Sequence, residues 1–312
     1  MSIMKAVRIH SFGGPEVLRV EEIERPEPRI DEILIRVEAA SVNPIDWKMR
    51  EGHYPAVQEE DLPYVLGRDV CGTVEKVGET VAAFRRGDAV FAFLNPRHGG
   101  YEQFVIARPE EVAPKPRAMN PVEAAAIPLA GITAWQGLFE HGELQAGQRV
   151  LIHGGAGGVG HLAIQFAKAK GAWVATTVSG DDLEFVRSLG ADEVIDYRRE
   201  RFEDRLEPVD LVFDLVAGET QHRSFGVVKT GGALVSTLSQ PDRTQAAALG
   251  IRVLRYTAQP NGAQLAEIGR LIEDGKVRVE VRRVYPLEQA PAAQEAIRME
   301  HNRGKIVLRV EH

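Results

Sequence analysis

Two hydrophobic patterns alternate along the second half of the chain and predict an α/β sheet. Residues 148–153 and 172–178 are short, mostly apolar runs, and the second is rich in β-branched residues, as expected of buried parallel strands. Between them, residues 161–168 carry apolar side chains at helical spacing. Later strands are expected at 193–196, 210–214, 232–237 and 251–256, with a helix at 183–189. Strands that alternate with helices predict a doubly wound parallel sheet with right-handed crossovers.

The first part of the chain shows a different pattern, in which short strands follow one another with turns between them. Strands are expected at 4–10, 16–21, 32–39, 70–77 and 89–93. Turn signals at Gly78 and at Gly87 separate the later strands. This pattern predicts a small β-rich, barrel-like domain that extends to about residue 116.

The remaining segments connect and complete these two parts. Residues 122–138 are alanine-rich and helical in character, with expected breaks at Pro128 and Gly131. The last part of the chain is expected to form a helix at 263–273, a strand at 277–284, a helix at 287–300 and a strand at 304–310.

Composition narrows the class of protein. A length of 312 residues favours two domains, since domains usually span about 100–200 residues. A net charge of −7 gives no general attraction to nucleic acid or to anionic membranes, and no uncharged run reaches transmembrane length. The single cysteine, Cys71, excludes an intramolecular disulfide and favours a reducing compartment, so we expect a cytoplasmic protein.

A glycine-rich loop at residues 154–160 lies between the first strand and the first helix of the α/β part. Gly155, Gly157 and Gly160 match the spacing G-x-G-x-x-G. In dinucleotide-binding folds the first glycine permits a tight turn, the second lets the backbone approach a pyrophosphate, and the third allows close helix–strand packing. The expected cofactor contacts are Gly155, Ala156, Gly157, Gly158, Val159 and Gly160. The alternative is a turn that only connects two packed elements.

Several short segments, in order along nearly the whole chain, carry a further signal. They are residues 40–46, 66–69 with 72–74, 87–90, 130–134, 153–160, 189–192 with 195–197, and 304–308. Together they resemble the medium-chain dehydrogenase/reductase superfamily, specifically its zinc-free quinone oxidoreductase (zeta-crystallin-like) branch. The resemblance implies a Rossmann doubly wound dinucleotide-binding domain at 121–261, and a β-rich, GroES-like barrel domain formed by 1–120 and 262–312. It also implies an active site in the cleft, at the carboxyl ends of the sheet strands.

The resemblance also concerns metal binding. Zinc alcohol dehydrogenases of this superfamily have a cysteine where this chain has Asn43, and a His-Glu pair where it has Arg68 and Asp69. A catalytic zinc needs about three Cys, His or carboxylate ligands. Asn43 and Arg68 cannot serve as ligands, and the four-cysteine loop of the zinc enzymes is absent. We therefore expect an enzyme without a metal.

The choice between the two nicotinamide cofactors depends on the residues after the second strand. NAD enzymes hold the ribose 2′-hydroxyl with Asp or Glu about 20 residues past the glycines, and Ser179 takes that position here. The resemblance places Tyr197 beside the 2′-phosphate of NADPH. Asp181 and Asp182 stand where relatives often carry a cation, or they cap the following helix instead. The two arginines at 198–199 are candidates for the missing cation, and we expect NADPH.

The resemblance also assigns residues around the nicotinamide and the substrate. The expected cofactor neighbours are Thr133, Val216, Leu238, Ser239 and Lys305, and the expected catalytic residues are Asn43, Lys48 and Tyr54. Alternatively, the Thr133 hydroxyl bonds within its own helix, and Lys305 is a solvated lysine at the start of an edge strand. Tyr54 is either a proton donor or an aromatic wall. Cys71 is more typical of a core residue than of a nucleophile.

These inferences predict an NADPH-dependent reductase of quinones or α,β-unsaturated carbonyls that acts on small molecules. One alternative is a cofactor-binding protein without turnover, in a structural or regulatory role. Another is an alcohol dehydrogenase, which the missing metal disfavours, since nothing would polarise the alcohol oxygen. We expect a homodimer because the strand at 251–256 is expected to end the sheet and leave an edge for pairing, and we expect no nucleic-acid or membrane partner.

Overall fold

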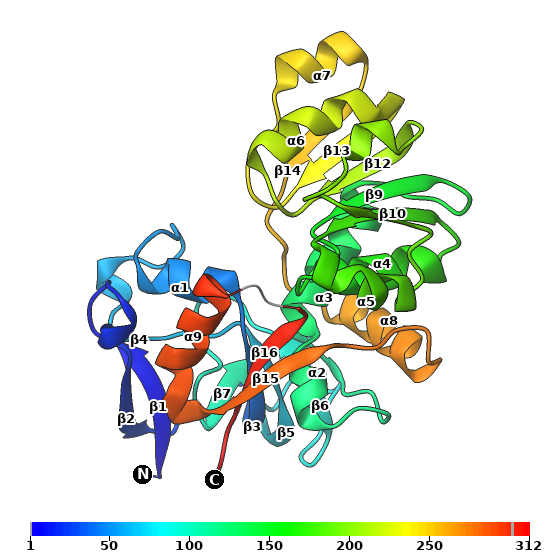
Figure 1. Ribbon diagram of the computed structural model, residues 1–312. Coiled ribbons are helices and arrows are strands. Elements are labelled where there is room, and N and C mark those ends of the chain that lie inside the picture. Colours follow the sequence, from blue (N-terminus) through cyan, green and yellow to red (C-terminus); the bar gives the residue numbers. More distant parts are fainter. Residues whose placement is uncertain (1, 301–302) are drawn as a thin grey trace. The chain divides into compact units, whose positions relative to one another are not determined.

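The computed structural model describes residues 2–300 and 303–312, and the chain forms two compact units (Figure 1). The first unit comprises Met1–Leu129, Pro260–Glu273 and Val279–His312, and the second comprises Ala130–Gln259 and Asp274–Arg278. The predicted first boundary lies after residue 120. Helix α2 (Pro121–Ala125), which follows that point, packs on strands of the first unit and therefore belongs to it.

The second unit is built on one parallel sheet with helices on both faces (Figure 1). Its strands are β9 (Arg149–His153), β10 (Trp173–Val178), β11 (Glu193–Asp196), β12 (Val209–Asp214), β13 (Val228–Ser236) and β14 (Arg252–Arg255). Its helices include α4 (Gly160–Ala169), α5 (Leu183–Ser188), α6 (Gly218–Ser224) and α7 (Arg243–Leu249). The strand order is β11-β10-β9-β12-β13-β14, and every neighbouring pair is parallel. The order reverses between β9 and β12, the switch point where doubly wound folds bind nucleotides, and the predicted fold class is confirmed.

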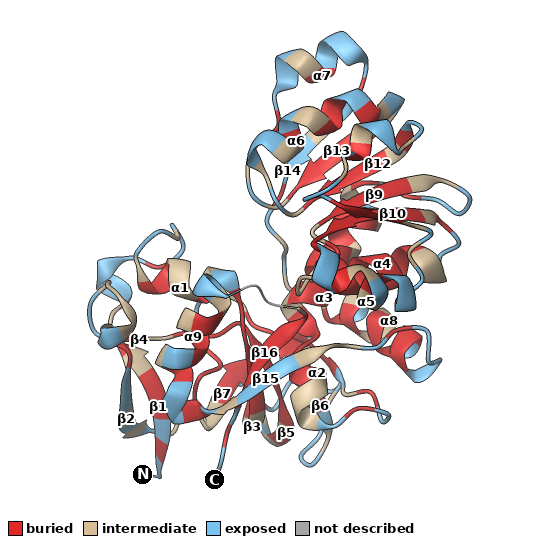
Figure 2. Cartoon of the chain, viewed as in Figure 1, coloured by how far each residue is buried: buried red, intermediate tan, exposed pale blue. Residues whose placement is uncertain are grey.

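Apolar side chains from the strands of this sheet are buried, and Figure 2 shows the central strands largely in the buried class. Leu151, Val212 and Leu234 are fully buried on neighbouring strands. Full burial of one such side chain stabilises a fold by about 1.5–3 kcal/mol. The nearly continuous apolar runs of the sequence thus correspond to strands that are covered on both faces.

The described residues of the first unit form two sheets. The larger has the order β15-β16-β3-β5-β6-β8, with β7 paired to β3, and the smaller has the order β2-β1-β4. The larger sheet consists of β3 (Ile33–Val42), β5 (Asp69–Val77), β6 (Ala89–Phe93), β7 (Phe104–Ala107), β8 (Val112–Pro114), β15 (Val281–Pro286) and β16 (Lys305–Arg309). The smaller consists of β1 (Ile3–Ile9), β2 (Arg19–Glu24) and β4 (Tyr64–Val65). Helices α1 (Pro44–Arg50), α8 (Gly262–Glu273) and α9 (Ala290–Met299) also belong to this unit.

Two strand pairings bring Asn43, Asp69 and Lys305 close together in the first unit. Strand β16 lies antiparallel to β3, with Ile306 opposite Val42. On the other side of β3, Asp69 at the start of β5 lies opposite Ser41. The end of β3 therefore meets the start of β5 and the start of β16, although these segments are far apart in the sequence.

Two elements differ from the sequence prediction. The segment expected as a strand at 16–21 begins with a 3₁₀ turn at Pro15–Val17, because a proline suits the first helical position and has no N–H to donate to a sheet. Gly131 does not break helix α3 (Pro128–Trp135), which begins at its proline and is followed by a π-helix. Within the described residues, no helix is both long and apolar enough to cross a membrane.

Candidate active site

The glycine loop of the second unit connects β9 to α4 at the carboxyl edge of the sheet. The backbone N–H groups of Gly154 and Gly155 donate to the carbonyl oxygen of Thr177 on β10 at 3.1 and 3.2 Å. A Cβ at Gly160 would lie 2.2 Å from the Gly154 carbonyl oxygen, so helix and strand approach too closely for a side chain. A Cβ at Gly157 would meet that oxygen at 3.4 Å and no other described atom within 4 Å, which leaves room beside this residue. A dinucleotide site requires these features of its second and third glycines.

His153 holds the strand that leads into this loop. Its Nδ1 lies 2.9 Å from the Thr177 hydroxyl oxygen, and its Nε2 lies 2.9 Å from the Ser224 hydroxyl oxygen. The Ser224 hydroxyl donates to the Thr220 carbonyl at 2.6 Å, so the bonding pattern assigns Nε2 as the donor to Ser224. Burial lowers the pKa of His153 to about 4, and the ring is neutral at neutral pH. The ring ties β9 to β10 and to α6.

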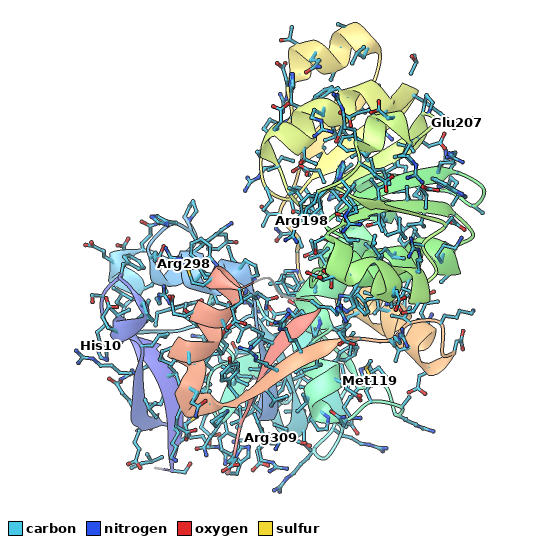
Figure 3. All side chains as sticks on the ribbon, viewed as in Figure 1. His10, Met119, Arg198, Glu207, Arg298 and Arg309 are labelled. Carbon is cyan, nitrogen blue, oxygen red and sulfur yellow. The ribbon has the colours of Figure 1, made fainter. Side chains whose placement is uncertain are left out.

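The residues predicted to bind the ribose follow β10 and β11. Ser179 is 1% exposed, and its hydroxyl donates to Oδ2 of Asp182 at 3.2 Å. Asp182 stands at the N-cap position of α5. Tyr197 is 55% exposed, and the guanidinium carbon of Arg198 (Figure 3) lies 5.9 Å from its ring centre. This end of the sheet thus offers an accessible phenol and an accessible cation, while the serine hydroxyl is engaged with a carboxylate.

The residues predicted near the nicotinamide lie after β12 and β13, on the opposite side of β9 from β10. Val216 is 48% exposed and Leu238 is 42% exposed. The Ser239 hydroxyl donates to Oε1 of Gln221 in α6 at 3.2 Å. Thr133 is buried in α3, and its carbonyl oxygen accepts a hydrogen bond from the Tyr256 hydroxyl at 2.5 Å.

In the first unit, Asn43, Asp69 and Lys305 form a buried polar cluster. The Lys305 ammonium donates to the Asn43 carboxamide oxygen at 2.5 Å and lies 3.6 Å from Oδ2 of Asp69. The Asn43 amide nitrogen donates to the same Asp69 oxygen at 2.8 Å, and so does the Ser41 hydroxyl at 2.5 Å. Lys305 is 3% exposed on an interior strand, so the alternative of a solvated lysine on an edge strand is wrong. The opposite charges of Lys305 and Asp69 allow both residues to be buried.

Asp46 adds a second carboxylate to this cluster. Its Oδ2 accepts from the Asn43 backbone N–H at 2.7 Å and from the Tyr101 hydroxyl at 2.8 Å. Its Oδ1 is buried and has no hydrogen-bond partner among the described residues. Burial raises the pKa of Asp46 to about 7, although both hydrogen bonds lower it. Burial lowers the pKa of Lys305, against the raising effect of Asp69 and Asp46. The Asp46 carboxyl therefore titrates near neutral pH.

Lys48 and Tyr54 lie in and just after α1. The Lys48 ammonium is 5.6 Å from the ring centre of Trp47. Tyr54 is half-buried and packs against the core of the first unit, as an aromatic wall would. Cys71 is fully buried in β5, and burial raises the pKa of its thiol far above the usual range. Cys71 is therefore a core residue, as expected.

The residues at the former zinc-ligand positions do not fit a catalytic zinc. Arg68 donates from Nε to the Leu94 carbonyl at 2.6 Å, and its guanidinium carbon lies 5.0 Å from the ring centre of Phe93. The carboxamide oxygen of Asn43 is occupied by the Lys305 ammonium. Throughout residues 2–300 and 303–312, no group of three or more His, Cys, Asp or Glu side chains is arranged to hold a metal ion.

Ser41, Asp46 and Tyr101 were not among the predicted site residues. Acidic residues close to apolar runs could have indicated buried carboxylates. A buried carboxylate requires hydrogen-bond partners or a counter-charge, and therefore a polar cluster around it. The identity of those partners depends on the pairing of β3 with β5 and β16.

Comparison with known proteins gives matches over nearly the whole chain. Residues 29–117 match the family model of the alcohol dehydrogenase GroES-like domain, and residues 189–308 match that of the zinc-binding dehydrogenase. The chain is 36% identical to the chloroplastic NADPH-dependent alkenal/one oxidoreductase of Arabidopsis thaliana, over 98% of this chain and 79% of that protein. It is 34% identical to the mitochondrial NAD(P)H oxidoreductase RTN4IP1 of Mus musculus, over 99% of this chain and 90% of that protein.

A solved structure shows the same fold. The quinone oxidoreductase from Coxiella burnetii is similar with a TM-score of 0.92 and 37% identity, covering 99% of this chain and 100% of that one. The GroES-like first unit, the doubly wound second unit and the glycine loop agree with these matches. The chain belongs to the medium-chain dehydrogenase/reductase superfamily, within its quinone oxidoreductase branch.

Proposed function

We propose that the protein is an NADPH-dependent reductase of quinones or α,β-unsaturated carbonyls that works without zinc. The names of its relatives support this reaction class, since they include an alkenal/one oxidoreductase and a quinone oxidoreductase. The observation that carries the proposal is the cluster of Asn43, Asp69 and Lys305, which replaces a metal site by hydrogen-bond donors and a positive charge.

The protein's own side chains are proposed to stabilise the negative charge that develops on the substrate oxygen. Bound NADPH would supply the hydride, and the residues of the glycine loop would hold its pyrophosphate. The side chains must orient the acceptor and stabilise the negative charge that develops on its oxygen. An enolate or a hydroquinone anion needs less stabilisation than a simple alkoxide, so hydrogen bonds suffice. One well-placed donor in a water-poor site lowers a barrier by about 3 kcal/mol.

Three side chains of the first unit are the proposed donors. Asp69 takes one N–H of the Asn43 amide, and the amide carries a second N–H for the substrate oxygen. Lys48 and Tyr54 contribute further donors from the same short segment. Tyr54 or a water molecule returns the final proton.

The preference for NADPH rests on the residues after β10 and β11. Tyr197 and Arg198 are exposed and suit a 2′-phosphate, and a serine replaces the usual carboxylate of NAD enzymes at position 179. The Asp182 carboxylate competes for the Ser179 hydroxyl and reduces the preference.

Assembly and location form a separate part of the proposal. Among the described strands β14 pairs with β13 alone, and its Leu254 is 36% exposed, so this edge is suited to pair with a second copy in a homodimer. A monomeric mass by light scattering at micromolar concentration would refute the dimer. The single cysteine supports a cytoplasmic location, which cell fractionation would test.

A substrate panel separates the candidate functions. Quinones, enones, saturated ketones and aldehydes would be supplied with NADPH and, separately, with NADH, and cofactor consumption would be followed. Fast reduction of quinones or enones supports the proposal, and equal rates on saturated carbonyls would reject the reaction class. Cofactor binding without consumption on any acceptor would instead support a binding protein without turnover.

A further inference from the structure

One buried carboxylate is bonded to the loop that follows β12. Asp214, at the end of β12, has no exposed surface. Its Oδ1 accepts from the backbone N–H groups of Val216 at 3.0 Å and Ala217 at 2.8 Å. Its Oδ2 accepts from the Gln221 amide at 2.8 Å and from the Ser236 hydroxyl at 2.8 Å. These four donors occupy both oxygens and fix the orientation of the carboxylate.

The loop after β13 is tied to the same carboxylate. The Gln221 amide nitrogen also donates to the Ser239 carbonyl at 3.1 Å, and the Ser239 hydroxyl donates back to Gln221 Oε1 at 3.2 Å. The Ser236 hydroxyl oxygen accepts from the Leu238 backbone N–H at 3.2 Å. Asp214 therefore holds the residue 215–217 loop directly and the residue 237–239 loop through Gln221 and Ser236.

Ala217 is strained where this carboxylate holds it. Its backbone has φ of 65° and ψ of −163°, a region that glycine occupies readily and alanine rarely. Such a conformation persists only when the surroundings impose it, and strained residues cluster at ligand sites. The hydrogen bond from the Ala217 N–H to Asp214 is one of these constraints.

The position of the two loops indicates what they hold. The pyrophosphate site follows β9, and the ribose-recognising residue follows β10 on one side of it. The other half of a bound dinucleotide must then extend to the other side, over β12 and β13. Val216 and Leu238 follow those two strands and expose apolar side chains, which suit the face of an aromatic ring.

We propose that Asp214 is a positioning residue, which holds Val216 and Leu238 as an apolar wall for the nicotinamide ring, and that the strain at Ala217 serves this placement. The inference rests on the proposed function only in that the protein binds a nicotinamide cofactor. Asp214 acts through the two loops and does not itself touch the ligand.

The decisive variant is Ala217→Gly, because it removes the strain without removing a side-chain contact to Asp214. We expect the melting temperature of the cofactor-free protein to stay equal or rise, while the Kd for NADPH rises by at least about threefold. A purely structural residue would not separate the two readouts in this way. Any other result, including an unchanged Kd or a fall in both stability and affinity, would overturn the proposal.

Two matched controls accompany this variant. Glu143 is another non-glycine residue with positive φ, at 54°, and lies before β9 at the amino end of the sheet. Glu143→Gly should leave the Kd for NADPH unchanged. Asp210→Asn removes a carboxylate at the amino end of β12, where it is bonded to the Arg149 backbone N–H and to Lys229, and should also leave Kd unchanged. An equal rise of Kd in either control would overturn the assignment to the Asp214 loops.

A second set of variants tests the carboxylate itself. Asp214→Asn replaces one acceptor oxygen by an N–H group and should raise the Kd for NADPH by about tenfold or more. Gln221→Ala removes one of the four donors to Asp214 together with the link to Ser239, and it leaves the bonds of Asp214 to Val216, Ala217 and Ser236 in place. It should raise Kd by a smaller factor, which keeps the test valid if Asp214→Asn fails to fold. Unchanged affinity in Gln221→Ala would refute the indirect link. Because these are binding measurements, failure to reduce any acceptor would reject the proposed function without affecting them, whereas a wild type that bound neither cofactor would overturn both.

Discussion

The ammonium nitrogen of Lys305 lies 2.5 Å from the carboxamide oxygen of Asn43, although 262 positions separate the two residues in the chain. Asp69 completes the arrangement by accepting from the Asn43 amide and by lying 3.6 Å from the same ammonium. The carboxamide is therefore oriented at both ends. Its orientation depends on one buried ion pair.

Removal of Lys305 should destabilise the protein. Lys305→Met would leave Asp69 as a buried charge without its cation, and breaking such a pair costs about 3–5 kcal/mol. The free energy of unfolding in urea measures this loss. The exposed pair of Lys168 and Asp192, at 2.7 Å, provides the control, and Lys168→Met should cost less than about 1 kcal/mol.

A double variant separates the charge effect from lost packing. Lys305→Met combined with Asp69→Asn removes both charges and should recover part of the stability that the single variant loses. Equal costs for Lys305→Met and Lys168→Met would contradict this account of the cluster.

The stability of the protein should carry a pH dependence that comes from Asp46. The pKa of Asp46 is raised from 3.8 to about 7, so the folded protein binds more protons than the unfolded chain between these values. The free energy of unfolding therefore falls as pH rises through this window, by up to about 4 kcal/mol, and stays level above it. Asp46→Asn should remove this component. Unfolding at pH 5 and pH 8 in both proteins measures it, and parallel pH profiles would refute the assignment.

The cofactor preference should increase when Asp182 loses its charge. Asp182→Asn leaves an acceptor for the Ser179 hydroxyl but removes the carboxylate that competes with a 2′-phosphate. We expect the Kd for NADPH to fall by about tenfold while that for NADH changes less. Ser179→Asp should act in the opposite direction, and Asp204→Asn, at an exposed acid, should change neither value. Fluorescence titration measures all three, and tighter binding of NADH than NADPH by the wild type would contradict the proposed preference.

Loss of a proposed donor should affect turnover more than cofactor binding. Asn43→Ala and Tyr54→Phe each remove a donor for the developing oxyanion, and the loss of one such donor lowers kcat by about 100-fold. Steady-state kinetics with an enone, together with the Kd for NADPH, measure the two effects separately. Full turnover in both variants would remove these residues from the reaction without rejecting the reaction class.

Chelation should leave the enzyme unchanged. Arg68 is bonded to the Leu94 carbonyl, and the Asn43 carboxamide oxygen is bonded to a lysine, so neither can accept a zinc ion in this arrangement. Extended dialysis against a chelator should change neither the reduction rate nor the melting temperature. A large loss of either would show that a metal takes part.

Elements with local signals could be predicted from the chain alone. The alternation of apolar strands and amphipathic helices predicted the doubly wound sheet, because each signal is contained in about 5–15 consecutive residues. The glycine loop is also local, since Gly155, Gly157 and Gly160 lie within one turn between adjacent elements. Their roles follow from backbone geometry that the spacing itself implies.

The contacts between polar groups, in contrast, depend on how distant strands pair. The contact of Lys305 with Asn43 requires β16 to pair with β3, and the contact of Asp69 requires β5 on the other side. The raised pKa of Asp46 comes mainly from its burial, and burial depends on how the whole unit packs. Asp214 likewise bonds to the residue 215–217 loop directly and reaches the residue 237–239 loop through Gln221, and α6 and β13 separate these two loops in the chain. Hydrogen-bond partners and burial depend on long-range strand register, which periodicity along the chain does not specify.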